Sequence, residues 1–349
     1  MSLRRYFLAL ATDEERGPAA SLVKLPLYLL SLVYSLFIRA LAAVRGARPF
    51  RPALKVISVG NITLGGTGKT VLVAHIARSL IADGRKTAVV SRGYGRPLRG
   101  DDTDFGRFGD EAGMLKRSIP GLEVIISADR VKGCGEAALR GCEAVILDDG
   151  FQQWGITKDL DIVCVDARGF GNSCLIPRGT LREPLSALRR ADAFVLTNCN
   201  LAGDTAPLER SLAALNDKAL IVRSEHASRG IFRQGREARP GEVTEACLVC
   251  GIGNPASFFE SCRSSGIRPS VRLAFPDHHR YGEEDASRII GACRENNIKA
   301  VVTTEKDWMR LPIGRLEAEG IAVYSLRVAL RIKGNEDELT GRLRRLFTA

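Results

Sequence analysis

The chain has 349 residues, which is long enough for two domains of ordinary size, and 45% of them are hydrophobic against 26% charged. This balance excludes an intrinsically disordered protein. The formal net charge of +11 predicts an anionic partner, and a nucleic acid, an acidic membrane surface or a phosphorylated substrate would each satisfy it.

The most apolar stretch of the chain comes first, at residues 21–44. Lys24, Pro26 and Arg39 interrupt it, so its uninterrupted core is shorter than the roughly 20 residues of a transmembrane helix. Helical spacing places a narrow polar stripe beside a wide apolar face, and the stripe consists of Lys24, Tyr28, Ser31, Ser35 and Arg39. This pattern is typical of a helix lying in the headgroup region of a membrane, and also of an ordinary buried helix, and the residues leave both interpretations open.

Strands and helices then alternate as far as residue 222. The strands are apolar without alternation, which is typical of a parallel sheet covered on both faces. We expect strands at 55–59, 87–90, 123–126, 144–147, 162–165, 193–196 and 219–222, with helices at 71–83 and near 132–140.

The composition changes near residue 225. Residues 225–241 are polar and basic, so they predict an extended linker or a hairpin. A second strand and helix series follows at 247–250, 255–264, 270–274, 283–296 and 300–303. Cys247 and Cys250 form a lone CxxC inside an apolar run, which indicates buried strand thiols rather than a metal or redox site.

A glycine-rich loop, GNITLGGTGKT at residues 60–70, stands between a predicted strand and a predicted helix. This is the context of a P-loop. The backbone amides of Gly65, Gly66, Thr67 and Gly68 can approach phosphate oxygens. Lys69 would reach the β- and γ-phosphates, and the Thr70 hydroxyl would bind Mg²⁺. The sequence therefore predicts nucleotide binding, although the usual pattern has glycine where Thr63 stands.

An apolar strand that ends in two carboxylates, Asp148 and Asp149, supplies a second metal-binding element. A carboxylate there can hold the water shell of Mg²⁺. The residues do not decide which of the two meets the metal. The alternative is a simple strand-end turn, because Asp-Gly is a turn signal.

An ordered set of motifs resembles the family of tetraacyldisaccharide 4′-kinases, also called lipid A 4′-kinases, from the N-terminal helix to about residue 330. Only the P-loop block is specific alone, but the set in this order is highly specific. The motifs are GNITLGGTGKT, SRGYGR at 91–96, GDEA at 109–112, SADR at 127–130, LDDGFQ at 147–152, PRGTLREP at 177–184, CGIGNPASFF at 250–259, FPDHHRY at 275–281 and TTEKD at 303–307.

The resemblance implies an α/β fold: a P-loop NTPase domain with a mostly parallel sheet, and a smaller α/β domain joined by a two-stranded linker. It implies ATP- and Mg²⁺-dependent phosphorylation of the 4′-hydroxyl of a tetraacylated glucosamine disaccharide 1-phosphate. It also implies association with the cytoplasmic face of the inner membrane. We expect a membrane-associated helical segment at 1–48, the kinase domain at 49–225, the linker at 226–244 and the smaller domain at 245–329, with 330–349 a candidate to return to the kinase domain.

The resemblance also assigns roles to residues. It implies that Asp110 is the general base and that His278 is its partner, with His279 as an alternative register. Lys69 completes the catalytic set. The remaining matches to family positions near the nucleotide or the acceptor are Arg92, Tyr94, Glu111, Arg130, Gln152, Arg182 and Glu183. Without the resemblance, most of these would be read as surface charges.

Two other classes of protein compete with this interpretation. A membrane-associated ATPase of partition or signalling type would also combine a glycine loop with a basic membrane helix. A nucleic-acid-binding protein would suit the positive charge, but aromatic residues make up only 6% of the chain and no known reader motif is found, so no nucleic-acid partner is expected. Nothing in the sequence indicates an oligomer.

Overall fold

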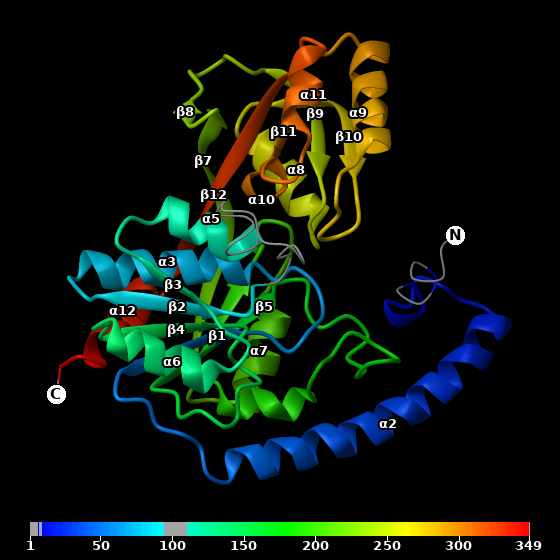
Figure 1. The fold of residues 1–349 in the computed structure, drawn as a ribbon. Coiled ribbons are helices and arrows are strands. Elements are labelled where there is room, and N and C mark those ends of the chain that lie inside the picture. The colour runs from blue at the N-terminus through cyan, green and yellow to red at the C-terminus, as the bar shows by residue number, and fades with distance from the viewer. Residues whose placement is uncertain (1–5, 7–8, 94–109, 349) are drawn as a thin grey trace. The chain divides into compact units, whose positions relative to one another are not determined.

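The computed structural model describes residues 6, 9–93 and 110–348 (Figure 1). The chain divides into two compact units, which are described separately. Unit 1 comprises Met1–Ser91, Ser127–Ser224 and Ile332–Ala349, and unit 2 comprises Arg92–Ile126 and Glu225–Arg331.

Unit 1 is built on a parallel sheet with strand order β7-β6-β5-β1-β4-β2. The strand residues of β2, β4 and β6 are buried throughout, as expected for a sheet covered on both faces. The bounds are β1 Lys55–Gly60, β2 Thr87–Ser91, β4 Ala144–Asp148, β5 Leu160–Asp166, β6 Ala193–Thr197 and β7 Leu220–Arg233. The predicted parallel sheet is confirmed, with strand ends that differ by one or two residues in most cases.

Helices connect these strands. The helix α3, Lys69–Ala82, buries Leu72, Ile76 and Leu80 on one face, which follows from their spacing of four residues. Asp129 caps α6, Arg130–Leu139, by accepting hydrogen bonds from the backbone of Val131 and Lys132. Unit 1 also contains α7 Ala206–Leu215, α12 Glu336–Arg345, a 3₁₀ helix at Leu185–Arg190 and the N-terminal helix described below.

The direction in which successive strands are added to this sheet reverses at the strand β1. From β1 the chain leads through α3 to β2 on one side, while β5, β6 and β7 extend the sheet on the other. In open parallel sheets the crevice at the carboxyl ends of the strands at such a point is the usual place for a ligand. The loop after Gly60 and the turn after Asp148 both lie at this edge, because β1 and β4 are parallel neighbours.

Unit 2 has a second parallel arrangement, with strand order β10-β9-β11-β12. Its strands are β8 Arg236–Glu237, β9 Glu245–Cys250, β10 Arg268–Ala274, β11 Ala300–Thr304 and β12 Ala322–Gly334. The strand β3, Glu123–Ile126, also belongs to unit 2 by its contacts, although it follows β2 in the strand order. Its helices are α5 Asp110–Ser118, α8 Pro255–Ser264, α9 Glu283–Glu295, α10 Glu305–Trp308 and α11 Ile313–Ala318. Cys247 and Cys250 are fully buried in β9, as expected for structural strand thiols.

Two strands carry the chain between the units. Both β7 and β12 begin in one unit and end in the other, and they are neighbours in the strand order. The predicted hairpin also forms, because β8 pairs antiparallel with the end of β7, with Phe232 opposite Glu237. The expected fold class, two α/β parts joined by a two-stranded connection, is therefore confirmed.

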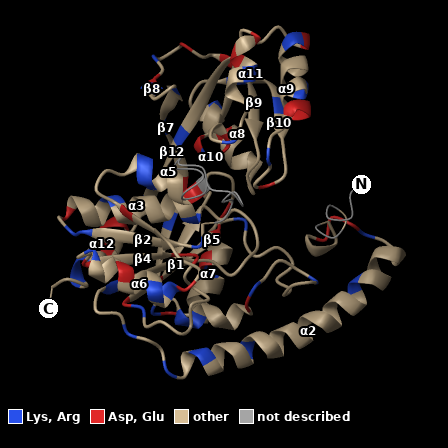
Figure 2. Cartoon of the chain, viewed as in Figure 1, with Lys and Arg blue, Asp and Glu red and all other residues tan. Residues whose placement is uncertain are grey.

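The N-terminal helix α2 spans Pro18–Gly46 and continues through Pro26 (Figure 1). Although the sequence suggested an apolar core too short to cross a membrane, the whole 29-residue helix satisfies that test by length and composition. Within the polar stripe, Ser31 is buried and its hydroxyl donates to the carbonyl of Leu175 at 2.8 Å, whereas Tyr28 and Arg39 are exposed. Tyr34, which lies outside the stripe, donates its hydroxyl hydrogen to the carbonyl of Arg182 at 2.9 Å. Apolar side chains are left exposed on the other faces, and Figure 2 shows few charged positions along this helix.

Candidate active site

The loop between β1 and α3 has the backbone of a phosphate-binding loop. Gly65 and Gly68 have φ angles of 108° and 80°, a region that favours glycine. Gly68 precedes the first turn of α3, so the free amides of that helix end open toward the loop. Lys69 and Thr70 are the first two residues of α3, as in the predicted motif.

Asn61 organises this loop from inside, a role that the sequence analysis did not assign. Its side chain is fully buried. The amide nitrogen donates to the Thr63 carbonyl at 2.9 Å and to the Thr67 hydroxyl at 3.0 Å, while the amide oxygen accepts from Lys69 Nζ at 3.1 Å. The sequence feature that could have indicated this role is the position of Asn61 at the start of the GNITLGGTGKT motif.

Asp149 is the carboxylate at the centre of the site. Its Oδ1 lies 3.5 Å from Lys69 Nζ, and Arg182 binds both of its oxygens at 2.8 Å. Such a bidentate pair fixes the orientation of a carboxylate more tightly than a single hydrogen bond does. Asp149 also has a φ of 57°, a left-handed conformation that only a few non-glycine residues adopt and that turns the chain sharply after β4.

The combined effect of neighbouring charges on the pKa of Asp149 is larger than the opposing effect of its burial. Burial raises the pKa of this carboxyl, but the hydrogen bonds from Arg182 and the nearby ammonium of Lys69 bring the pKa well below its usual range. Asp149 is therefore ionised at neutral pH. In this arrangement it holds the side chains of Lys69 and Arg182 by ion pairs.

Asp148, the other candidate metal ligand, has a different environment. It is 7% exposed, and its carboxylate accepts a hydrogen bond from the Ser91 hydroxyl at 3.0 Å. Its carbonyl accepts from Arg130, which is itself 2% exposed. In the described residues no group of three or more His, Cys, Asp and Glu side chains forms a metal centre.

Gln152 and Glu183, both predicted to bind substrate, contact each other. Gln152 Nε2 donates to Glu183 Oε1 at 2.8 Å and to the carbonyl of Asn61 at 3.0 Å. Glu183 is 2% exposed and is paired with Arg190 at 3.0 Å. The predicted residues Lys69, Asp149, Arg182, Gln152 and Glu183 therefore form one connected polar network through Asn61.

A cavity of about 280 Å³ lies beside this network, between the end of α2 and the start of α6. Arg130 and Gln152 line it, together with Arg45 and Trp154. Within the described part of the chain, the buried indole nitrogen of Trp154 and the buried side-chain oxygen of Gln152 make no hydrogen bond.

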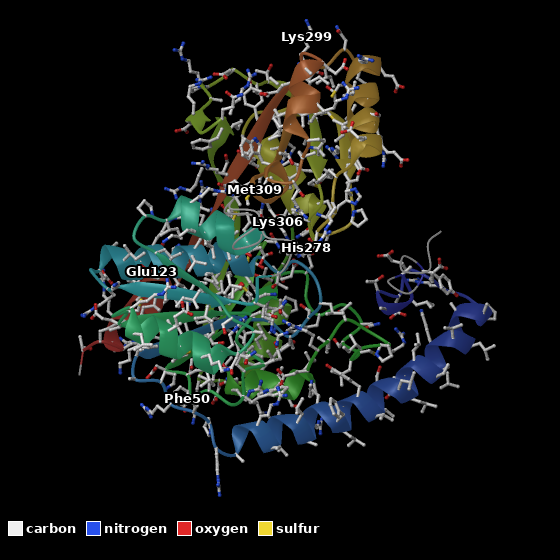
Figure 3. All side chains as sticks on the ribbon, in the orientation of Figure 1. Phe50, Glu123, His278, Lys299, Lys306 and Met309 are labelled. Carbon is white, nitrogen blue, oxygen red and sulfur yellow. The ribbon has the colours of Figure 1, made fainter. Side chains whose placement is uncertain are left out.

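A second cluster of predicted residues forms within unit 2. Lys306 Nζ lies 3.1 Å from Glu111 Oε1, 3.4 Å from Asp277 Oδ1 and 3.2 Å from His278 Nε2 (Figure 3). Glu111 is in the first turn of α5, which begins at Asp110. His278 adopts a φ of 59° in the loop after β10, and its amide donates to the carbonyl of Gly251.

His279 is engaged elsewhere. Its Nε2 lies 2.9 Å from Asp285 Oδ2, and its ring stacks on Phe275 with the ring centroids 4.9 Å apart. Asp285 also accepts from the backbone of Gly282 at the start of α9. Of the two histidines that the sequence left open, His278 is the one in contact with the Glu111 cluster.

Three predicted residues are not placed in either cluster. Tyr94 and the side chain of Asp110 lie outside the described residues, and Arg92 is exposed immediately before them. The structure thus brings together the nucleotide motifs in unit 1, and Glu111 with His278 in unit 2.

A parallel sheet with a glycine loop at the carboxyl end of its central strand, a lysine and threonine opening the next helix, and an acidic strand end beside them define a P-loop NTPase. Residues 23–348 match the family described as tetraacyldisaccharide-1-P 4′-kinase. The chain belongs to this family.

Individual relatives agree over nearly the whole chain. The tetraacyldisaccharide 4′-kinase of Halothermothrix orenii is 34% identical, over 92% of this chain and 93% of its own length. That of Geobacter sulfurreducens is 38% identical, over 89% of this chain and 91% of its own length. A crystal structure of LpxK from Aquifex aeolicus in complex with ATP is similar in fold, with a TM-score of 0.69 and 25% identity, and covers 93% of this chain and 99% of that one.

Proposed function

We propose that this protein transfers the γ-phosphate of ATP to the 4′-hydroxyl of a tetraacylated glucosamine disaccharide 1-phosphate, the step that its relatives' name describes. The observation that carries the proposal is the cluster of Lys69, Asp149 and Arg182 at the phosphate loop, in a chain of the tetraacyldisaccharide 4′-kinase family. The alternative of an ATPase without an acceptor is not favoured by family membership.

The residues present fit a magnesium–nucleotide complex. Mg²⁺ prefers oxygen ligands and is usually held by one or two carboxylates together with phosphate oxygens. Thr70, Asp148 and Asp149 supply such oxygens around the loop. Held there by these oxygens, the ion would supply positive charge that offsets the negative charge developing on the transferred group.

Lys69 has a defined task when nucleotide arrives. In the structure its ammonium group interacts with Asn61 and Asp149. We propose that it moves from this pairing to the β- and γ-phosphate oxygens, with the amides of Gly65, Gly66, Thr67 and Gly68 holding the same phosphates. Arg182 keeps Asp149 ionised and in place during the exchange, because it binds both oxygens of the carboxylate.

The acceptor hydroxyl needs a base, because a sugar hydroxyl is a poor nucleophile. We assign Asp110 as the general base that accepts the hydroxyl proton, and His278 as its partner. Arg92, Tyr94, Glu111, Arg130, Gln152, Arg182 and Glu183 form the proposed acceptor and nucleotide surroundings. Support for this assignment comes from Glu111 and His278, which meet at Lys306, and from the cavity lined by Arg130 and Gln152.

We further propose that α2 inserts its exposed apolar side chains into the inner membrane from the cytoplasmic face. Leu22, Leu36 and Val44 are 76%, 71% and 75% exposed, which is unusual for large apolar residues outside a membrane or a partner surface. An acylated acceptor would then be reached without leaving the bilayer. Deleting residues 18–46 should release the protein from membranes and raise the KM for the acceptor while ATP binding persists; a truncated protein that still pellets with membranes would contradict this.

The experiment that tests the proposed function compares ATP turnover with and without the acceptor lipid in detergent micelles. Turnover should require the tetraacylated disaccharide 1-phosphate and Mg²⁺ together. Equal turnover without acceptor would instead support the acceptor-free ATPase. The Lys69→Ala variant serves as the background control.

A further inference from the structure

Lys306 lies on a short, tightly fixed helix, although neither the motifs nor the proposed mechanism give it a role. The helix α10 follows β11 directly, and the hydroxyl of Thr304 caps it by accepting from the amide of Asp307. Asp307 is fully buried and receives hydrogen bonds from the Gly251 amide at 2.9 Å and from Arg310 at 2.6 Å. Within the TTEKD motif, the hydrogen bonds of Thr304 and Asp307 therefore fix the backbone on both sides of Lys306.

The ammonium group of Lys306 joins two segments that are far apart in the sequence. It contacts Glu111 in the first turn of α5, and both Asp277 and His278 in the loop after β10. The lysine side chain is only 14% exposed, whereas Glu111, Asp277 and His278 are 29%, 32% and 38% exposed and keep contact with solvent. Asp110, the proposed base, is the residue immediately before Glu111 at the start of α5.

The charge state of Lys306 is settled by its neighbours. Burial lowers the pKa of the ammonium, but the carboxylates of Glu111 and Asp277 outweigh burial and raise the pKa above its usual value. A charged ammonium has three hydrogens to donate and no lone pair to accept. Every atom that it contacts must therefore be an acceptor.

His278 is constrained by this rule. Its Nε2 lies 3.2 Å from Lys306 Nζ, so Nε2 must offer a lone pair, and the ring hydrogen must be on Nδ1. The carboxylate of Asp277 is 3.9 Å from the same Nε2, beyond hydrogen-bond reach, and is satisfied in part by the lysine. The described charged groups that face the ring are thus Lys306 and Asp277.

We propose that Lys306 is a positioning residue that holds His278 in the neutral tautomer protonated at Nδ1 and ties it to the start of α5. The proposal rests on the proposed function, in which His278 partners the base. It decides between two roles for this histidine: while Lys306 donates to Nε2, the ring acts as an Nδ1–H donor that orients a carboxylate and does not take up the hydroxyl proton.

The test measures the tautomer directly in the full-length protein. The chain has four histidines, so ¹⁵N-histidine labelling gives a small set of ring signals, and His278→Gln assigns the one of interest. In the wild type at neutral pH we expect the His278 signal of an Nδ1–H ring. In Lys306→Met it should change to the Nε2–H form or to a mixture, while Lys306→Arg should keep the wild-type pattern.

Kinetics supply the second readout. Lys306→Met should lower kcat by up to about 10²-fold, the scale for misplacing a catalytic group, with the KM for ATP within about twofold of wild type. Lys306→Arg should recover part of kcat. The matched control is Lys299→Met, an exposed lysine of the same unit, which should leave tautomer and kcat unchanged (Figure 3).

An Nε2–H ring in the wild type would overturn the proposal, even if Lys306→Met did not fold. So would a folded Lys306→Met protein with an unchanged His278 signal or an unchanged kcat. The NMR arm needs no turnover, so the proposal can fail while the kinase assignment stands, and a protein without kinase activity would still report the tautomer.

Discussion

Asp149→Asn should tighten nucleotide binding in the absence of magnesium and lower turnover in its presence. In the structure, Asp149 lies 3.5 Å from Lys69 Nζ, and the two side chains are 23% and 20% exposed. A unit pair at this distance interacts by about 1 kcal/mol in water and about 5 kcal/mol at an effective dielectric of 20. Because both groups retain solvent contact and Asn61 and Arg182 share the charges, we take about 1–2 kcal/mol.

That energy opposes the transfer of Lys69 to ATP phosphates. Its removal should tighten Mg²⁺-free ATP binding by about 5- to 30-fold, since each 1.4 kcal/mol is about tenfold in affinity. With Mg²⁺ present, the variant should lose a metal ligand, and kcat should fall on the order of 10²-fold. Raising Mg²⁺ should recover part of this loss.

The assay is a titration with a fluorescent ATP analogue, with EDTA or with saturating Mg²⁺, followed by turnover at several Mg²⁺ concentrations. Asp148→Asn is the matched comparison, because Asp148 is hydrogen-bonded to Ser91 whereas Asp149 forms the ion pair with Lys69. That variant should leave Mg²⁺-free affinity unchanged. An Asp149→Asn protein with unaltered or weaker Mg²⁺-free binding and a wild-type Mg²⁺ dependence would refute the reasoning.

Other parts of the account make separate predictions. Lys69→Ala and Thr70→Ala should each abolish transfer, and near-normal turnover in either would remove the loop from the mechanism. Asp110→Asn should lower kcat on the order of 10²–10⁴-fold and His278→Ala by less, with a double variant little worse than Asp110→Asn; additive losses would argue against a dyad. The hydrogen bond from Lys24, opposed by burial and aided by Arg178, lowers the pKa of Asp13 to about 2. Its contribution to holding the start of α2 is present above the unfolded value of about 3.9 and is lost as pH falls toward 2, so limited proteolysis before α2 should increase over that range, and less so in Asp13→Asn; equal pH dependence in both proteins would contradict this.

Much of the fold was readable from local patterns. Unalternating apolar runs predicted the parallel strands. The change of composition near residue 225 predicted an extended linker or a hairpin, and β7 and β8 form the hairpin. The predicted domain bounds stay predictions. Nothing in the local sequence indicated that residues 92–126 belong to unit 2. Their assignment depends on which segments pack together rather than on the composition of the segment itself.

Sequence motifs located several residues of the site, but they did not predict which of these side chains contact one another. The P-loop pattern located Lys69 and Thr70, but nothing in the sequence indicated that Arg182 would bind Asp149 from 33 residues away. The pairing of Glu111 with Lys306 spans 195 residues and follows only from the tertiary fold. The sequence grouped Ser31 with Tyr28 and Arg39 on one polar stripe of α2, but it did not indicate that, of these three, only Ser31 would be buried.

The most direct test of the central claim identifies the position of the new phosphate. Purified protein, ATP, Mg²⁺ and tetraacylated disaccharide 1-phosphate are incubated, and the lipid product is analysed by mass spectrometry and ³¹P NMR. The account predicts a product heavier by one phosphate, with a new phosphomonoester on the 4′-oxygen of the distal sugar and one ADP released per phosphate transferred. ADP formation with unmodified lipid, or a phosphate on another oxygen, would contradict it.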